Sequence, residues 1–130
     1  MTTRSTIVAC GVWVTSKKLV VAVVEPLGFV SAELFVPRRD DARHALLRTV
    51  GGIAGAELVF CGAQSDPIVS LARERRVPFW LVHAGFVDGF CRAAGFRRPT
   101  PRRLAALLAR LPSTPYPWVL AGIHRHAPAP

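Results

Sequence analysis

Residues 11–24 read GVWVTSKKLVVAVV, and this stretch decides the fold. An apolar segment runs up to Trp13, a short polar turn follows from Thr15 to Lys18, and residues 19–24 are wholly apolar. A connection this short joins antiparallel neighbours in a sheet. The second segment is apolar on both of its faces, which predicts a strand covered from both sides. The stretch also raises a question, because a large aromatic side chain stands just before the turn.

The rest of the chain continues with alternating strand and helix patterns. Strands are predicted over residues 6–14, 19–24, 29–36, 57–61 and 77–82. Helices are predicted over residues 40–50, from Asp66-Pro67 onward, over 84–94 and over 101–111, with Asp40 or Asp41 capping the first and Thr100 the last. The order is βββαβαβα plus a last helix. It predicts an α/β domain with a mixed five-stranded sheet, because strand–helix–strand units follow a three-stranded meander.

Length and composition predict a single domain. The chain has 130 residues, of which 51% are hydrophobic, enough for a core. We assign residues 1–111 to the domain and the proline-rich residues 112–130 to an irregular C-terminal tail. The longest apolar run, residues 19–24, is too short to cross a bilayer, so we expect no membrane contact. Three widely spaced cysteines in apolar surroundings favour buried thiols and a cytoplasmic location.

Positive charge is concentrated in the last third of the chain. Residues 1–88 contain ten Lys or Arg and all eight acidic residues, whereas residues 89–130 contain seven Arg and no acid. Such asymmetry favours a polyanionic partner, either DNA or structured RNA. The alternative is that the arginines come from an arginine-rich proteome and only solvate a helix face.

The order of the elements is that of the ribonuclease H-like fold, and the residues carry a more specific resemblance. The stretch GVWVTSKKLVVAVVEPLG resembles the opening of the DEDD transposases and DNA invertases (the Piv and insertion-sequence-110 class), whose N-terminal domain is RuvC-like. In that family a glycine, an aliphatic residue and an aspartate precede the polar turn. Gly11 and Val12 match the first two, and Trp13 falls on the aspartate. Residues 58–76 and 87–111 are similar to the family's later segments, so the resemblance covers residues 6–111.

All four acidic positions of the family are lost in this chain. They fall on Trp13, Gly62, Pro101 and Leu104, and a shift of one residue puts Cys61 in place of Gly62. The resemblance implies that four carboxylates there would hold two divalent metal ions for phosphodiester cleavage. The nearest acids, Asp66 and Asp88, suit a helix cap and a first helical turn. We therefore expect no metal, no cofactor and no catalytic activity.

The resemblance and the charge together predict a non-catalytic, transposase-derived RNase H-like domain that acts as a nucleic-acid-binding or regulatory module. The candidate contact residues are Lys17, Lys18, Arg97, Arg98, Arg102 and Arg103. One alternative is a protein–protein module without nucleic-acid binding, which forms a homodimer or a mixed assembly with a transposase-like partner. Phe96, Trp80 and Trp118 favour it as aromatics available for an interface. A further alternative is a decaying transposon fragment.

Overall fold

The computed structural model describes residues 8–25, 28–61, 66–113 and 123–126 of the chain. Its elements are β1 (Val8–Val14), β2 (Lys18–Val24), β3 (Val30–Pro37), α1 (Asp40–Gly51), β4 (Ala56–Cys61), α2 (Ile68–Glu74), β5 (Phe79–Val82), α3 (Ala84–Ala93), α4 (Pro101–Arg110), a 3₁₀ turn (Leu111–Ser113) and β6 (Ile123–His126). None of the helices within these ranges is long and apolar enough to cross a membrane.

The strands form one mixed sheet in the order β3-β2-β1-β4-β5-β6. β1 pairs with β2 antiparallel and with β4 parallel, while β2 pairs with β3 antiparallel and β4 with β5 parallel. The five predicted strands and their order are thus confirmed, and the topology is that of an RNase H-like fold. Trp13 lies opposite Val20 in this register, directly before the turn that leads into β2.

A sixth strand differs from the irregular tail expected over residues 112–130. β6 pairs antiparallel with β5, and the ring of His126 stacks on Phe79 with centroids 4.9 Å apart. This strand has only four residues in a proline-rich surrounding, so its local pattern is weak, and pairing with β5 supplies the partner for its backbone. The rest of the tail, residues 114–122 and 127–130, lies outside the described residues.

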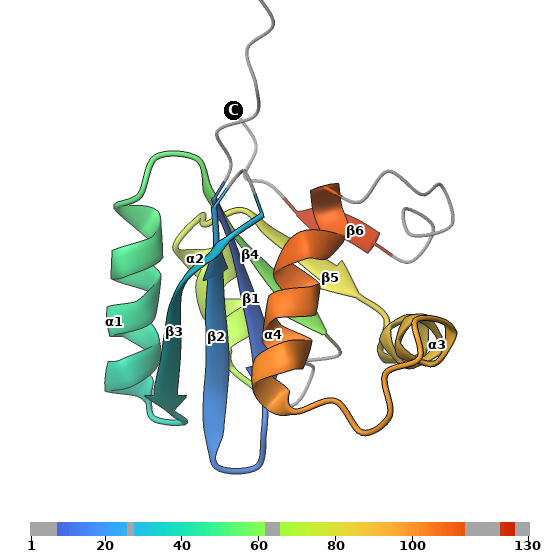
Figure 1. Ribbon diagram of the computed structural model, residues 1–130. Coiled ribbons are helices and arrows are strands. Elements are labelled where there is room, and N and C mark those ends of the chain that lie inside the picture. The colour runs from blue at the N-terminus through green and yellow to red at the C-terminus, as the bar shows by residue number, and fades with distance from the viewer. Residues whose placement is uncertain (1–7, 26–27, 62–65, 114–122, 127–130) are drawn as a thin grey trace, which may run out of the picture.

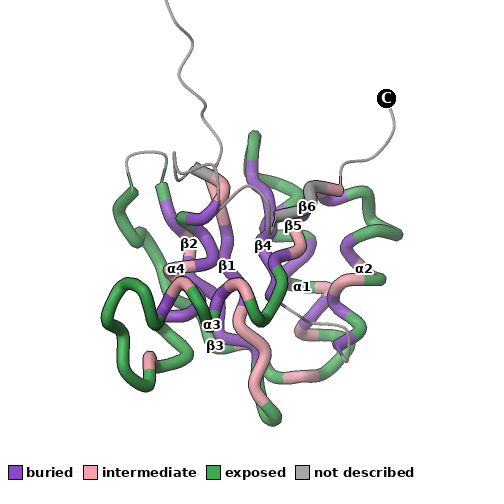
Figure 2. Tube along the Cα trace, turned by 90° about the vertical axis from the view of Figure 1, so that its right-hand side faces the viewer, coloured by how far each residue is buried: buried purple, intermediate pink, exposed green. Residues whose placement is uncertain are grey.

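Helices cover the two faces of the sheet (Figure 1). Cys10 and Val12 of β1 pack on the side of α1 and α2, in a cluster with Leu47 and Ile68. The alternate residues of β1 point to the other face, where Trp13 packs among residues of α3 and α4. Buried residues of β1, β2 and β4 run through the middle of the molecule in Figure 2, as two covered faces require.

The N-cap predicted for α4 is present in the structure, whereas the N-cap predicted for α1 is not. Thr100 caps α4, since its hydroxyl accepts a hydrogen bond from the N–H of Arg103 at 3.3 Å, and Pro101 occupies the first helical position as predicted. α1 differs: Arg39 is its N-cap residue, without a side-chain cap. Asp40 and Asp41 lie in its first turn instead, where carboxylates interact favourably with the helix dipole.

The backbones of the sheet and of α4 approach each other very closely at Gly11. A Cβ atom added to Gly11 would lie 1.8 Å from the carbonyl oxygen of Ala105 and 2.7 Å from the amide nitrogen of Ala109. Ala105 is fully buried, and Ala109 is nearly so. The backbone of α4 therefore rests directly on β1 at a position that admits no side chain, so the glycine in the family-like opening of the chain has a packing role.

We predict that Gly11→Ala lowers the free energy of unfolding by about 3 kcal/mol or more, because α4 must move off the sheet to admit the methyl group. Gly89→Ala is the matched control. Gly89 lies inside α3, and an added Cβ there meets nothing within 4 Å. This change should be neutral or stabilise the protein by up to about 1 kcal/mol. Urea unfolding followed by circular dichroism measures both, and equal effects of the two substitutions would contradict the packing role.

Candidate nucleic-acid interface

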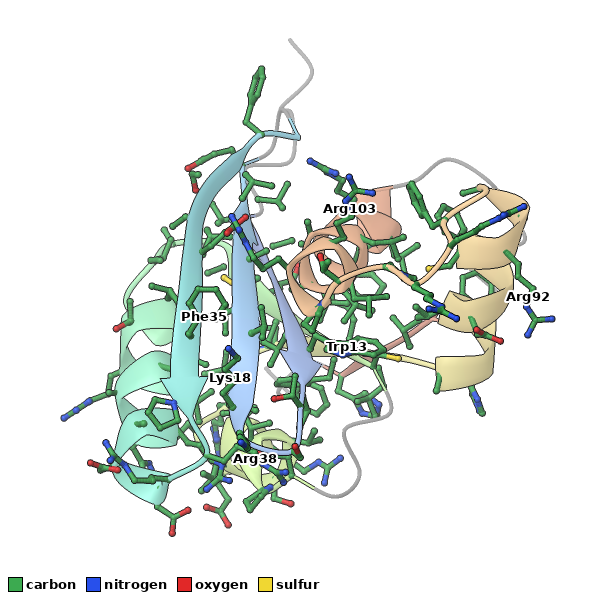
Figure 3. All side chains as sticks on the ribbon, turned by 60° about the horizontal axis from the view of Figure 1, so that its bottom comes forward. Trp13, Lys18, Phe35, Arg38, Arg92 and Arg103 are labelled. Atoms are coloured by element: carbon green, nitrogen blue, oxygen red, sulfur yellow. The ribbon has the colours of Figure 1, made fainter. Side chains whose placement is uncertain are left out.

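Trp13 fills the space between the end of β1 and the start of α4. Its half-buried side chain packs against two clusters, one containing Cys61, Val87 and Leu104, the other containing Val20 and Ala105 (Figure 3). An aromatic side chain contributes a large apolar area to such a contact. Trp13 therefore holds the sheet and the last helix together at the point where the resemblance would place a metal-binding aspartate.

The other three positions to which the resemblance assigns an acidic residue have different environments. Leu104 is buried in the same cluster as Trp13, and so is Cys61, the alternative to Gly62. Pro101 is exposed at the first position of α4. Gly62 lies outside the described residues. The structure thus brings Trp13, Cys61 and Leu104 together in one cluster of apolar side chains.

Buried cysteines on both faces of the sheet, Cys61 near Trp13 and Cys10 on the side of α1 and α2, are protonated at neutral pH. Burial, together with the neighbouring Cys91, raises the pKa of the Cys61 thiol to about 11, and burial raises the pKa of Cys10 to about 11. A thiol rather than a thiolate is a poor nucleophile and a poor metal ligand. These side chains therefore behave as small core residues.

Asp66 and Asp88, the acids named from the sequence as nearest to these positions, have other partners. The buried carboxylate of Asp66 accepts hydrogen bonds from Arg38 Nε at 2.8 Å, from Arg43 Nε at 3.1 Å and from the backbone N–H of Ile68 at 2.8 Å. Burial opposes its ionisation, but these hydrogen bonds outweigh burial and hold the pKa of Asp66 below its ordinary value. Asp88 is exposed on α3 and pairs with Arg92. Within the described ranges, no group of three or more His, Cys, Asp or Glu could hold a metal ion.

The candidate basic residues gather at one end of the molecule. Lys17 and Lys18 lie on and beside the β1–β2 turn, Arg97 and Arg98 in the connection from α3 to α4, and Arg102 and Arg103 in the first turn of α4; all six residues are exposed. Figure 1 shows that these three segments lie at the lower end of the sheet. Three stretches separated in sequence thus contribute positive charge to one end.

Two of the six residues have partners within the protein. Arg102 forms an ion pair with Glu33 of β3, with Nε 2.6 Å from the carboxylate. The ammonium group of Lys18 lies 4.7 Å from the centre of the Phe35 ring. For the side chains of Lys17, Arg97, Arg98 and Arg103 the described part of the chain offers no ion pair or hydrogen bond. As far as the described residues go, these four side chains are available to bind an anion.

Sequence reasoning missed the part played by Arg38. Its guanidinium donates to the backbone carbonyl of Thr15 at 3.2 Å and also binds Asp66, so it ties the β1–β2 turn to the start of α2. The turn itself is closed by Thr15, whose hydroxyl accepts from the N–H of Lys18 at 3.0 Å. Arg38 and Asp66 are 28 residues apart, and no local pattern in the sequence predicts that they pair.

No protein-family model matches the chain, and a search of curated proteins finds no significant match.

We predict that Trp13→Asp destabilises the protein by about 2–4 kcal/mol, because it removes a large packed aromatic and puts a charge into an apolar site. Trp13→Phe keeps an apolar ring and should cost about 1 kcal/mol. Mg²⁺ or Mn²⁺ should neither raise the melting temperature of the wild-type protein nor produce DNA cleavage. Thermal unfolding with and without each ion, and a plasmid nicking assay, make these measurements. A Trp13→Asp variant as stable as its parent, or metal-dependent cleavage by pure protein, would show that Trp13 does not replace a ligand.

Proposed function

We propose that this protein is a non-catalytic RNase H-like domain, related to DEDD transposases, that binds DNA or structured RNA through the basic end of its sheet. The observation that carries the proposal is the gathering of exposed Lys17, Arg97, Arg98 and Arg103 from three separate segments. Residues 89–130, which supply three of these four, contain no acidic residue to neutralise them. The apolar packing of Trp13 and Leu104 supports a binding role rather than metal-dependent cleavage.

The chemistry of such a surface favours phosphate contacts. Arginine side chains form paired hydrogen bonds to phosphate oxygens and do not lose their charge at any physiological pH. Contacts to the phosphate backbone fix position and give affinity without reading base sequence. The site would therefore bind with affinity that depends steeply on salt concentration and only weakly on base sequence.

We predict that replacing Arg97, Arg98 and Arg103 together by Gln weakens binding and makes the negative slope of log affinity against log salt shallower by about 2–3. Each lost phosphate contact means that about one counterion fewer is released on binding. Fluorescence anisotropy with a short DNA duplex and with a structured RNA, at several salt concentrations, measures the slope.

A double variant, Arg75→Gln with Arg76→Gln, is the control. These two residues are exposed near the start of β5, at the opposite end of the parallel strands. An equal loss in the control would assign binding to net charge alone. Absence of binding of either ligand by the wild-type protein at low salt would refute the proposed function.

A second candidate function, self-association, is favoured by the exposed edge strand β3. Phe29 is 70% exposed, Leu34 40% and Phe35 52%, and within the described residues no strand lies beyond β3. An exposed apolar edge is a site for strand pairing. In a two-fold antiparallel pair, the start of one β3 faces the end of the other, so Phe29 would come near Leu34 or Phe35 of a second copy. The charge of Glu33, in the middle of β3, is neutralised by Arg102.

We predict that Leu34→Lys prevents this self-association, because it puts a charge onto the paired edge. Size-exclusion chromatography with light scattering should show a wild-type dimer at high and low salt and a monomeric variant. Ile53→Lys is the control, since Ile53 is 38% exposed but precedes β4. A wild-type protein that is monomeric at every concentration, or a control variant that also becomes monomeric, would rule β3 out as the interface.

A further inference from the structure

A pocket of about 450 Å³ lies between α4 and the connection from α3 to α4. Its lining is mainly apolar and aromatic, with Phe90 from α3, Phe96 and Pro99 from the connection, and Leu104 and Leu107 from α4. Pockets of about 300–1,000 Å³ are typical of sites for small ligands. The pocket borders the cluster against which Trp13 packs, because Leu104 and Leu111 belong to that cluster and Phe90 and Leu107 pack against it.

The aromatic wall is built by the way α3 ends. Gly95 has a positive φ of 80°, its N–H donates to the carbonyl of Arg92 at 3.1 Å, and the N–H of Phe96 donates to the carbonyl of Cys91 at 2.8 Å. These two bonds form the Schellman arrangement, in which the residue after the glycine turns back over the last turn of the helix. Phe96 is thereby placed beside Phe90 in the pocket lining, yet its side chain remains 41% exposed.

Positively charged residues contribute to the lining of this pocket and follow it in the sequence. Arg103 contributes to the lining, and Figure 3 shows it on the side of α4 opposite Trp13. Arg97 and Arg98 follow Phe96 directly, and Arg98 adopts a left-handed φ of 50°, an uncommon conformation for a residue other than glycine. The chain has no acidic residue from position 89 onward to compete for these arginines. An aromatic surface next to several arginines suits a ligand with a flat apolar part and a negative charge.

We propose that this pocket takes an unpaired nucleobase from a single-stranded or looped segment of nucleic acid, with the base against Phe96 and the flanking phosphates on Arg97, Arg98 and Arg103. The inference rests on the proposed function and adds the class of nucleic acid to it. A base stacks on an exposed aromatic ring whatever its identity, and arginines hold the adjoining backbone. In a duplex the bases remain stacked inside the helix, so a duplex reaches only the arginines.

The test is a thermodynamic cycle between Phe96 and the base. Binding of a short fluorescein-labelled oligothymidylate is compared with binding of the same strand carrying abasic sites at its centre and with binding of a duplex, at one fixed salt concentration. The Phe96→Ala variant should bind the intact strand about tenfold more weakly. It should bind the abasic strand and the duplex as the wild-type protein does, because the partner of the ring is already missing there.

Two further variants separate stacking from general apolar contact. Phe96→Tyr keeps an aromatic ring and should bind like the wild type, whereas Phe96→Leu keeps an apolar side chain and should behave like Phe96→Ala. Ile53→Ala removes a similarly exposed apolar side chain, 38% against 41%, outside the pocket and should leave binding of all three ligands unchanged. Phe96 lies in an exposed connection, and its backbone hydrogen bond to Cys91 does not need the ring, so these variants should fold.

The outcomes distinguish this inference from the function on which it rests. If wild-type protein binds every strand and Phe96→Ala weakens all of them equally or not at all, the base pocket is wrong while nucleic-acid binding stands. If the wild-type protein binds none of them, both fail. If Phe96→Ala instead leaves binding of the intact strand unchanged and disrupts self-association, the pocket receives a protein side chain and the proposal is overturned.

Discussion

The close contact between Gly11 and the backbone of α4 is the constraint on which the rest of this structure depends. Because Ala105 and Ala109 lie directly on β1, α4 sits lower over the sheet than a helix bearing large side chains could. In this position, the first turns of α4 contact both the end of β1 and the edge strand β3. Trp13, two residues beyond Gly11, packs against the start of α4, and Arg102 reaches Glu33 on the edge strand. Other residues of α4 line the pocket between α4 and the α3–α4 connection, together with Phe96.

Much of this architecture follows from local patterns in the sequence. The short turn after Trp13 requires antiparallel pairing, the apolar residues 19–24 require cover on both sides, and Thr100-Pro101 marks the start of α4. Ion pairs between distant segments cannot be predicted from local patterns. Arg102 and Glu33 are 69 residues apart and meet only once the sheet has formed. β6 was missed because four residues among prolines give a weak strand pattern until β5 provides a partner. The pocket is likewise a product of tertiary packing between α3 and α4.

The candidate site combines an RNase H-like frame with side chains of a different chemistry. In this frame the end of β1 and the start of the last helix lie side by side, a geometry suited to gathering carboxylates around metal ions. Here the same geometry gathers indole, thiol and leucine side chains, which contribute packing energy instead. The charges that remain at this end are arginines and lysines on turns and connections, where they are exposed to partners. The elements at this end thus have an RNase H-like arrangement, while their side chains form an apolar core with a basic rim.

The position of α4 over β1 also has a consequence for how the chain reaches its fold. Gly11 and Ala105 are about 90 residues apart, so the face of the sheet that carries Trp13, Val20 and Ala22 has no cover until the far end of the domain has been synthesised. The β1–β2–β3 meander is local and can form early, whereas docking of α4 is a long-range event that closes a large loop. Until then, an apolar surface next to an open sheet edge is exposed to other chains, a state prone to aggregation. Residues 101–111 therefore protect the nascent sheet as well as completing its core.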